Sequence, residues 1–102
     1  MEIKRPAMAG TMESSDVQIS IRPIPGSENQ IIINSPVKVQ FGHLIEAVVL
    51  KVLTTSSVRG VEVSVNDRGA LDATITARLQ TALMRAAEED TLDWEVAHSW
   101  KS

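Results

Sequence analysis

Residues 30–66 constrain the fold more than any other part of the sequence. They begin with three consecutive isoleucines at 31–33, which predict a strand that is covered on both faces or lies centrally in a sheet. They end with residues 58–66, where valine recurs at alternate positions and predicts a second strand. A helical pattern separates the two. Strand, helix and strand in this order predict a β-α-β crossover with parallel strands.

Two residues predict where the helix inside this crossover begins. Ser35 followed by Pro36 is typical of an N-cap and the first helical residue. Its predicted buried stripe consists of Phe41, Leu44, Ile45, Val48, Val49, Val52 and Leu53. A second amphipathic helix follows a turn at residues 66–69 and ends near Glu88. Its predicted buried face consists of Leu71, Ile75, Leu79, Ala82, Leu83 and Ala86.

Two further strands precede the crossover. Residues 17–22 alternate apolar and polar side chains, and the weaker segment 7–13 can pair with them through a polar turn at residues 13–16. The predicted order is therefore β-β-β-α-β-α. We expect an α+β fold: a mixed four-stranded sheet with two helices on one face and a polar opposite face. The hairpin tip would hold a serine hydroxyl clear of the protein body.

The 102 residues fit one domain, which we place at residues 1–89, followed by a C-terminal tail at residues 90–102. The tail holds both tryptophans, Trp94 and Trp100, together with His98. Two interpretations stay open for Trp94: an anchor for a partner protein, or part of a tail that folds back on its own domain or is frayed. For Trp100 we favour the second.

Composition argues against several classes of function. The formal net charge of −3 and the scattered basic residues argue against nucleic-acid binding. The absence of cysteine removes disulfides and thiolate zinc sites. No apolar run is long enough to span a bilayer, so we expect no membrane partner and a cytoplasmic location. His43 is expected to be a surface residue, and the acidic run 88–90 a solvated helix end. We therefore assign no catalytic residue and no metal site.

The most specific feature is the stretch 10–17, which reads Gly-Thr-Met-Glu-Ser-Ser-Asp-Val. It resembles the Gly-Thr-Leu-Glu-Ser-Gly-Asp-Val pattern of the citrate lyase acyl carrier proteins, the gamma subunits of bacterial citrate lyase. Further matches follow in the family's order and spacing at residues 34–35, 40–42, 58–61, 69–72, 77–79 and 94–95. Two positions depart from the pattern: Met12 replaces leucine, and Ser15 replaces a glycine that often occupies a positive φ.

The resemblance implies a non-catalytic carrier subunit. In the family, the serine equivalent to Ser14 carries 2'-(5''-phosphoribosyl)-3'-dephospho-CoA through a phosphodiester, attached by a prosthetic-group transferase. The arm shuttles acetyl and citryl thioesters between the alpha subunit, an acyl transferase, and the beta subunit, a citryl lyase. The complex converts citrate to acetate and oxaloacetate in citrate fermentation. Ser15 is an alternative attachment point, because it places a second hydroxyl beside the first.

Two alternatives remain open at this level. The carrier subunit of malonate decarboxylase uses a related arm, although its pattern fits residues 13–16 less well. The chain could also be a small α+β binding or regulatory module without an arm. Glu13 and Asp16 flank Ser14 with negative charge, which predicts that an anionic arm is repelled from the turn and held by cations of partner enzymes. A plainer reading of Asp16 is that it accepts hydrogen bonds from the turn backbone.

Overall fold

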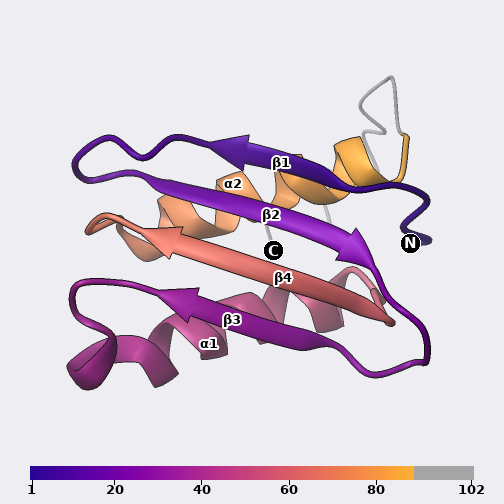
Figure 1. The fold of residues 1–102 in the computed structure, drawn as a ribbon, viewed down its shortest axis with the longest axis horizontal. Helices are drawn as coiled ribbons and strands as arrows, with labels where there is room; N and C mark the ends of the chain where they lie inside the picture. The colour runs from indigo at the N-terminus through magenta and orange to yellow at the C-terminus, as the bar shows by residue number, and fades with distance from the viewer. Residues whose placement is uncertain (89–102) are drawn as a thin grey trace.

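The fold consists of one sheet backed by two helices. A computed structural model describes residues 1–88, except for the side chains of Lys38 and Val39. The strands are β1 (Ala7–Gly10), β2 (Val17–Pro23), β3 (Gln30–Asn34) and β4 (Val61–Asp67); the helices are α1 (Lys38–Thr55) and α2 (Asp72–Ala86). Both helices lie behind the sheet in Figure 1. The predicted α+β fold, its element order and its single helical layer are confirmed.

The sheet is mixed, with the strand order β1-β2-β4-β3. β2 pairs antiparallel with both β1 and β4, whereas β3 and β4 run parallel, as a β-α-β crossover requires. Consequently the β1–β2 loop, the β3–α1 connection and the β4–α2 connection all lie at one end of the sheet, on the left in Figure 1. Three segments that are distant in sequence therefore meet around the hairpin loop.

The core lies between the sheet and the two helices. β2 and β4 contribute alternate residues that are almost wholly buried, which confirms the predicted alternation at Val61, Val63 and Val65. On the outer face the polar side chains form an ion pair between Arg22 and Glu62, with Nη2 and Oε2 separated by 2.7 Å. The helical core residues are Ile45, Val49, Val52, Leu53, Ile75, Leu79, Ala82, Leu83 and Ala86.

Some predicted core positions are wrong. Phe41 is 47% exposed, Leu44 is 52% exposed and Leu71 is 76% exposed. Phe41 and Leu44 line an open hollow between the beginnings of α1 and α2, and Leu71 precedes α2 as its N-cap residue. The isoleucine run 31–33 is neither central nor covered on both faces. β3 is an edge strand, and Ile32 on its open face is 51% exposed.

The start of α1 also differs from the prediction. The helix begins at Lys38, with Val37 at the N-cap and no side-chain cap. Ser35 still accepts a hydrogen bond from the Val37 amide at 3.2 Å, but its hydroxyl donates to Asp67 at 2.8 Å. The serine thus ties two connections together and does not cap the helix.

Part of the sequence interpretation stays a prediction. Residues 89–102 lie outside the described residues, and with them both tryptophans, His98 and the proposed boundary between residues 1–89 and 90–102. Within residues 1–88, no helix has the length and apolar character needed to cross a membrane.

Candidate functional site

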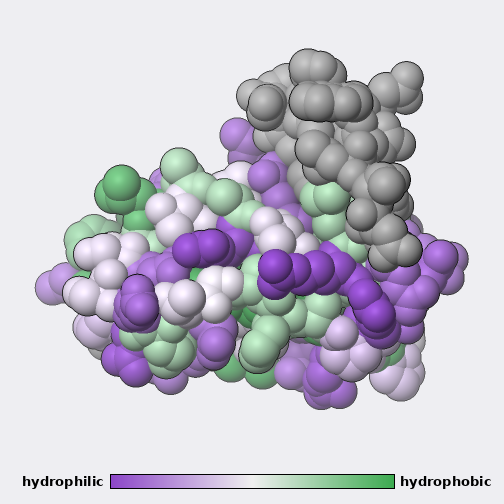
Figure 2. Space-filling model, turned by 90° about the horizontal axis from the view of Figure 1, so that it is seen from above, coloured by the Kyte–Doolittle hydropathy of each residue, from purple (hydrophilic) through white to green (hydrophobic). Residues whose placement is uncertain are grey.

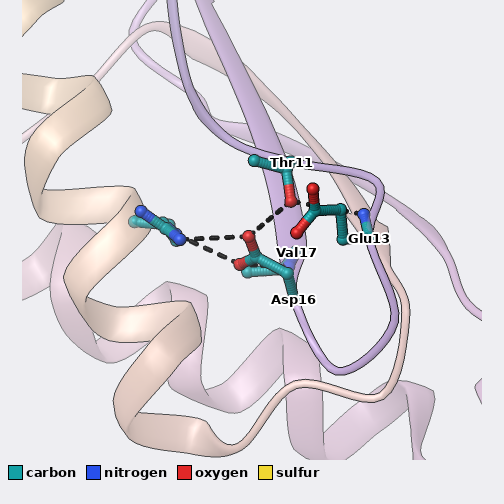
Figure 3. A network of polar contacts seen from close by, with 5 residues as sticks. Thr11, Glu13, Asp16 and Val17 are labelled. Atoms are coloured by element: carbon teal, nitrogen blue, oxygen red, sulfur yellow. Dashed lines mark hydrogen bonds and ion pairs between the residues drawn. The ribbon is translucent and has the colours of Figure 1, made fainter.

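The hairpin loop begins at a residue that must be glycine. Gly10 ends β1 with a φ of +90°, and a Cβ atom at this position would lie 1.8 Å from the Val17 carbonyl oxygen. A side chain therefore cannot fit without moving the neighbouring strand. This close approach brings Thr11 and Asp16 to opposite sides of a narrow loop at residues 11–16 (Figure 3).

The Asp16 carboxylate joins the two ends of this loop to each other and to α2. Its carboxylate accepts hydrogen bonds from the Thr11 hydroxyl at 2.6 Å and from the Val17 amide at 2.7 Å. The Arg78 guanidinium, from α2, donates to both carboxylate oxygens, at 3.1 Å and 3.0 Å. We call these four residues, Thr11, Asp16, Val17 and Arg78, the loop base. The bidentate geometry fixes the loop to the helix behind the sheet.

The loop base also sets the ionisation of Asp16. The Thr11 hydrogen bond, the Arg78 guanidinium and the Val17 amide together hold the pKa of Asp16 well below its usual range. The carboxylate is therefore ionised at every pH at which the chain is expected to work. The plainer sequence reading of Asp16, a carboxylate that bonds turn backbone, is confirmed, and the charge is neutralised by Arg78 as well.

Residues 12–15 form the outer part of the hairpin loop, and all four are exposed. We call them the loop crest. Ser15 has a φ of 67°, in the left-handed region that glycine favours. This is the position at which the carrier-protein pattern has glycine. The Ser15 amide donates to the Arg68 carbonyl at 2.8 Å, and the Arg68 amide donates to the Asp16 carbonyl at 2.9 Å. The crest thus lies against the turn after β4.

Ser14 is an exposed turn residue of the crest. Its hydroxyl has no hydrogen-bond partner within residues 1–88, in contrast to the Thr11 hydroxyl in the base. An exposed, unbonded alcohol is free to approach a substrate held by another protein. The structure also leaves the Ser15 hydroxyl exposed, but Ser15 is held by its backbone to Arg68.

The turn that supports the crest depends on Asp67, which sequence reasoning missed. Asp67 is only 3% exposed. Its Oδ1 accepts from the Gly69 amide at 3.1 Å and the Ala70 amide at 2.9 Å, and its Oδ2 accepts from Ser35. An aspartate in a predicted turn, two residues before a glycine, is a known signal for such bonding. Arg78 lies in the matched stretch 77–79, but its pairing with Asp16 was missed, because the two residues are 62 positions apart.

The site can present a nucleophile, but no hydrogen bond within residues 1–88 joins the Ser14 hydroxyl to a base, the neighbouring Glu13 carboxylate included. Asp16 is committed to Arg78, and His43 lies exposed on α1. Among the residues that the structure describes, no cluster of three histidine, aspartate or glutamate side chains could hold a metal ion. The arrangement is suited to being modified by another enzyme. It also corrects one sequence expectation about the two acids that flank Ser14: Asp16 is paired with Arg78, whereas Glu13 has no ion pair within residues 1–88.

Figure 2 views the molecule from above, over the edge of the sheet that β1 forms in Figure 1. Hydrophilic and hydrophobic side chains are interspersed on the part of this face that the described residues form. The visible part of this face that residues 1–88 form is therefore mixed in character.

Comparison with known proteins places the chain among carrier proteins. A protein-family model described as malonate decarboxylase delta subunit (MdcD) matches residues 4–86. Proteins named citrate lyase acyl carrier protein are similar over nearly the full length. The one from Serratia proteamaculans is 50% identical over 92% of both chains, and the one from Lacticaseibacillus casei is 47% identical over 98% of both. One from Vibrio cholerae is 45% identical over 92% of this chain and 96% of its own.

One solved structure shares the fold. A crystal structure of a protein from Thermus thermophilus matches 86% of this chain with a TM-score of 0.52 and 14% identity, but the match covers 16% of that protein. At this identity the likeness concerns the fold alone.

Proposed function

Because the chain belongs to the citrate lyase acyl carrier protein family, we propose that it is the non-catalytic carrier subunit of a citrate lyase complex, with Ser14 as the attachment point. The observation that carries the proposal is the Ser14 hydroxyl, which is exposed on the loop crest with no hydrogen-bond partner among residues 1–88. The hydrogen bonds of the loop base hold the two ends of the same loop together. A cytoplasmic location is part of the same proposal.

The residues present fit a covalently attached arm. Attachment of 2'-(5''-phosphoribosyl)-3'-dephospho-CoA requires one accessible alcohol and space for a chain that leaves the surface, and the crest offers both. When bound, the group supplies a terminal thiol that holds acyl groups as thioesters. The protein then keeps the tether within reach of its partners, which raises the effective concentration of the thioester at each active site.

The loading step needs little from this chain. The Ser14 oxygen forms the new bond to phosphorus, its proton passes to a base on the prosthetic-group transferase, and the transferase's donor substrate loses its leaving group. No hydrogen bond within residues 1–88 joins the Ser14 hydroxyl to a base, so we assign this base to the transferase. The alpha and beta subunits of citrate lyase would likewise carry out acyl exchange and citryl cleavage.

Intact-mass measurement tests the proposal. The purified chain is incubated with the prosthetic-group transferase and its donor substrate, and its mass is compared with that of Ser14→Ala and Ser15→Ala. We expect one arm on the wild type and on Ser15→Ala, and none on Ser14→Ala. Loading of Ser14→Ala together with failure of Ser15→Ala would move the site to Ser15. A wild type that gains no mass would favour a module without an arm.

A second candidate is the carrier of malonate decarboxylase, which the description of the matching family model favours. The relatives at 45–50% identity favour citrate lyase. Loaded chain can be offered separately to the alpha and beta subunits of citrate lyase and to the partner subunits of malonate decarboxylase. We expect citrate cleavage in the first mixture and no malonate decarboxylation in the second.

A further inference from the structure

We infer that Arg68 is an anion-binding residue for the arm, with its guanidinium on the phosphodiester that joins the arm to Ser14. This inference rests on the proposed function and extends it, because it assigns to the carrier itself a cation that the sequence alone led us to expect from partner enzymes. Three features of the described residues support it: the position of Arg68, its charge, and the surface beside it.

The position of Arg68 is fixed by two backbone hydrogen bonds to the loop. Its carbonyl accepts from Ser15 at 2.8 Å and its amide donates to the Asp16 carbonyl at 2.9 Å. The Ser14 Cα atom is two covalent bonds from the Ser15 nitrogen, so it lies within about 6 Å of the Arg68 carbonyl oxygen. A long side chain at position 68 therefore starts close to the serine that would carry the phosphorus.

The charges around the crest leave Arg68 available. Arg78 is occupied by Asp16, with Nη2 and Oδ2 separated by 3.0 Å. Arg68 is exposed, and its guanidinium has no ion pair or hydrogen bond within residues 1–88. Guanidinium is also the side-chain group whose planar fork matches two phosphate oxygens. A phosphodiester on Ser14 would place a permanent negative charge beside an unpaired positive one.

A shallow polar hollow lies beside Arg68. It has a volume of about 190 Å³ and separates the hairpin loop from the β3–α1 connection. Cavities that enclose whole small ligands measure about 300–1,000 Å³, so this hollow suits one group of the arm. Its lining residues are Met12, Asn34, Ser35, Pro36, Asn66, Asp67 and Arg68. Met12 of the loop crest forms part of this lining. Arg68 is the only arginine in it.

The test compares arginine side-chain Nε–H resonances in the unloaded and loaded chain by nuclear magnetic resonance. We expect the Arg68 resonance to shift on loading and to return toward its unloaded position as salt is raised, because the contact is exposed and screened. Arg59 is the internal control: it is also exposed, but it precedes β4, at the other end of that strand from Arg68. Its resonance should not move.

A second readout follows the phosphorus itself. The ³¹P resonance of the linkage should differ between loaded wild type and loaded Arg68→Gln, and should be unchanged in loaded Arg59→Gln. An arm on Ser14 with an unmoved Arg68 resonance and the same ³¹P shift in all three proteins would overturn this inference and leave the proposed function intact. A chain that accepts no arm, or accepts it on Ser15, would instead overturn the proposed function.

Discussion

The loop base and the loop crest belong to the same hairpin loop, apart from Arg78 of α2, yet their side chains differ in hydrogen bonding and exposure. In the base, Asp16 accepts hydrogen bonds from three residues, one of them on α2. In the crest, all four residues are exposed, and the Ser14 hydroxyl has no partner within the described part of the chain. The side-chain hydrogen bonds are thus concentrated at the ends of the loop and not at the proposed attachment residue. The contrast suggests a division of roles for a carrier of this kind: some residues fix the loop by hydrogen bonds, and a different residue presents the exposed hydroxyl.

The largest effect is expected from Gly10→Ala, which breaks the base by forcing the strands apart. The new Cβ would meet the Val17 carbonyl at 1.8 Å, in addition to the cost of a side chain at positive φ. We expect unfolding to become easier by more than about 1 kcal/mol, which lowers Tm by more than about 4 °C. Gly26→Ala is the matched control, because Gly26 has a φ of +92° and nothing within 4 Å of a Cβ. Equal losses in the two variants would contradict the close approach.

A smaller effect is expected from Asp16→Asn, which preserves the size of the side chain and removes its charge. Arg78 then loses its only ionic partner within residues 1–88, so Tm should fall by a few degrees and transferase loading should slow. The matched control is Glu62→Gln, which breaks the Arg22–Glu62 pair on the outer face of the sheet. That variant should load at the wild-type rate. Thermal melts and timed intact-mass measurements check both predictions. Equal loading rates in the two variants would contradict the claim that the loop base positions the loop for loading.

Much of the fold could be predicted from the sequence. The core was predictable, since valine alternation in β4 and the helical spacing of Ile75, Leu79 and Leu83 depend on local period alone. The turns at residues 13–16 and 66–69 were also predicted from their polar residues. The resemblance pointed to Ser14, and the structure adds that its hydroxyl is exposed.

What could not be foreseen depends on contacts between distant residues. Arg78 reaches Asp16 across 62 positions, and Ser35 reaches Asp67 across 32. Neither pairing leaves a periodic signal. The misplacement of Phe41 and Leu71 has a similar cause: a helical stripe shows which face is apolar, but not how far along the helix the partner extends. The central position predicted for residues 31–33 failed because strand order is a tertiary property.

A modest effect is expected from Ser15→Gly, which removes a side chain from a left-handed backbone position in the loop crest. Glycine adopts the φ of 67° without strain, so we expect a gain in stability of up to about 1 kcal/mol and unchanged loading. Ser57 has a φ of 55° and is also exposed, far from the loop in sequence, so Ser57→Gly should stabilise by a similar amount. Urea denaturation measures both. A stable Ser15→Gly variant that fails to load would assign a role to the Ser15 hydroxyl and contradict the account.

The smallest effect concerns pH. The folded-state pKa of Asp16 lies below the ordinary value of 3.8, so its contribution to stability is fully present above that value and is lost as the pH falls below it. The Tm difference between wild type and Asp16→Asn should therefore be constant from about pH 8 to pH 5 and shrink below about pH 4. A difference that already vanishes near pH 6 would show that the base does not hold an ionised Asp16.

Fragmentation mass spectrometry of the loaded chain tests the central claim most directly, by locating the arm on a peptide that contains both Ser14 and Ser15. We predict fragment ions that assign the whole added mass to Ser14, with Ser15 unmodified. An adduct on Ser15, or on any residue outside the crest, would contradict the claim that the free crest hydroxyl is the point at which this carrier is loaded.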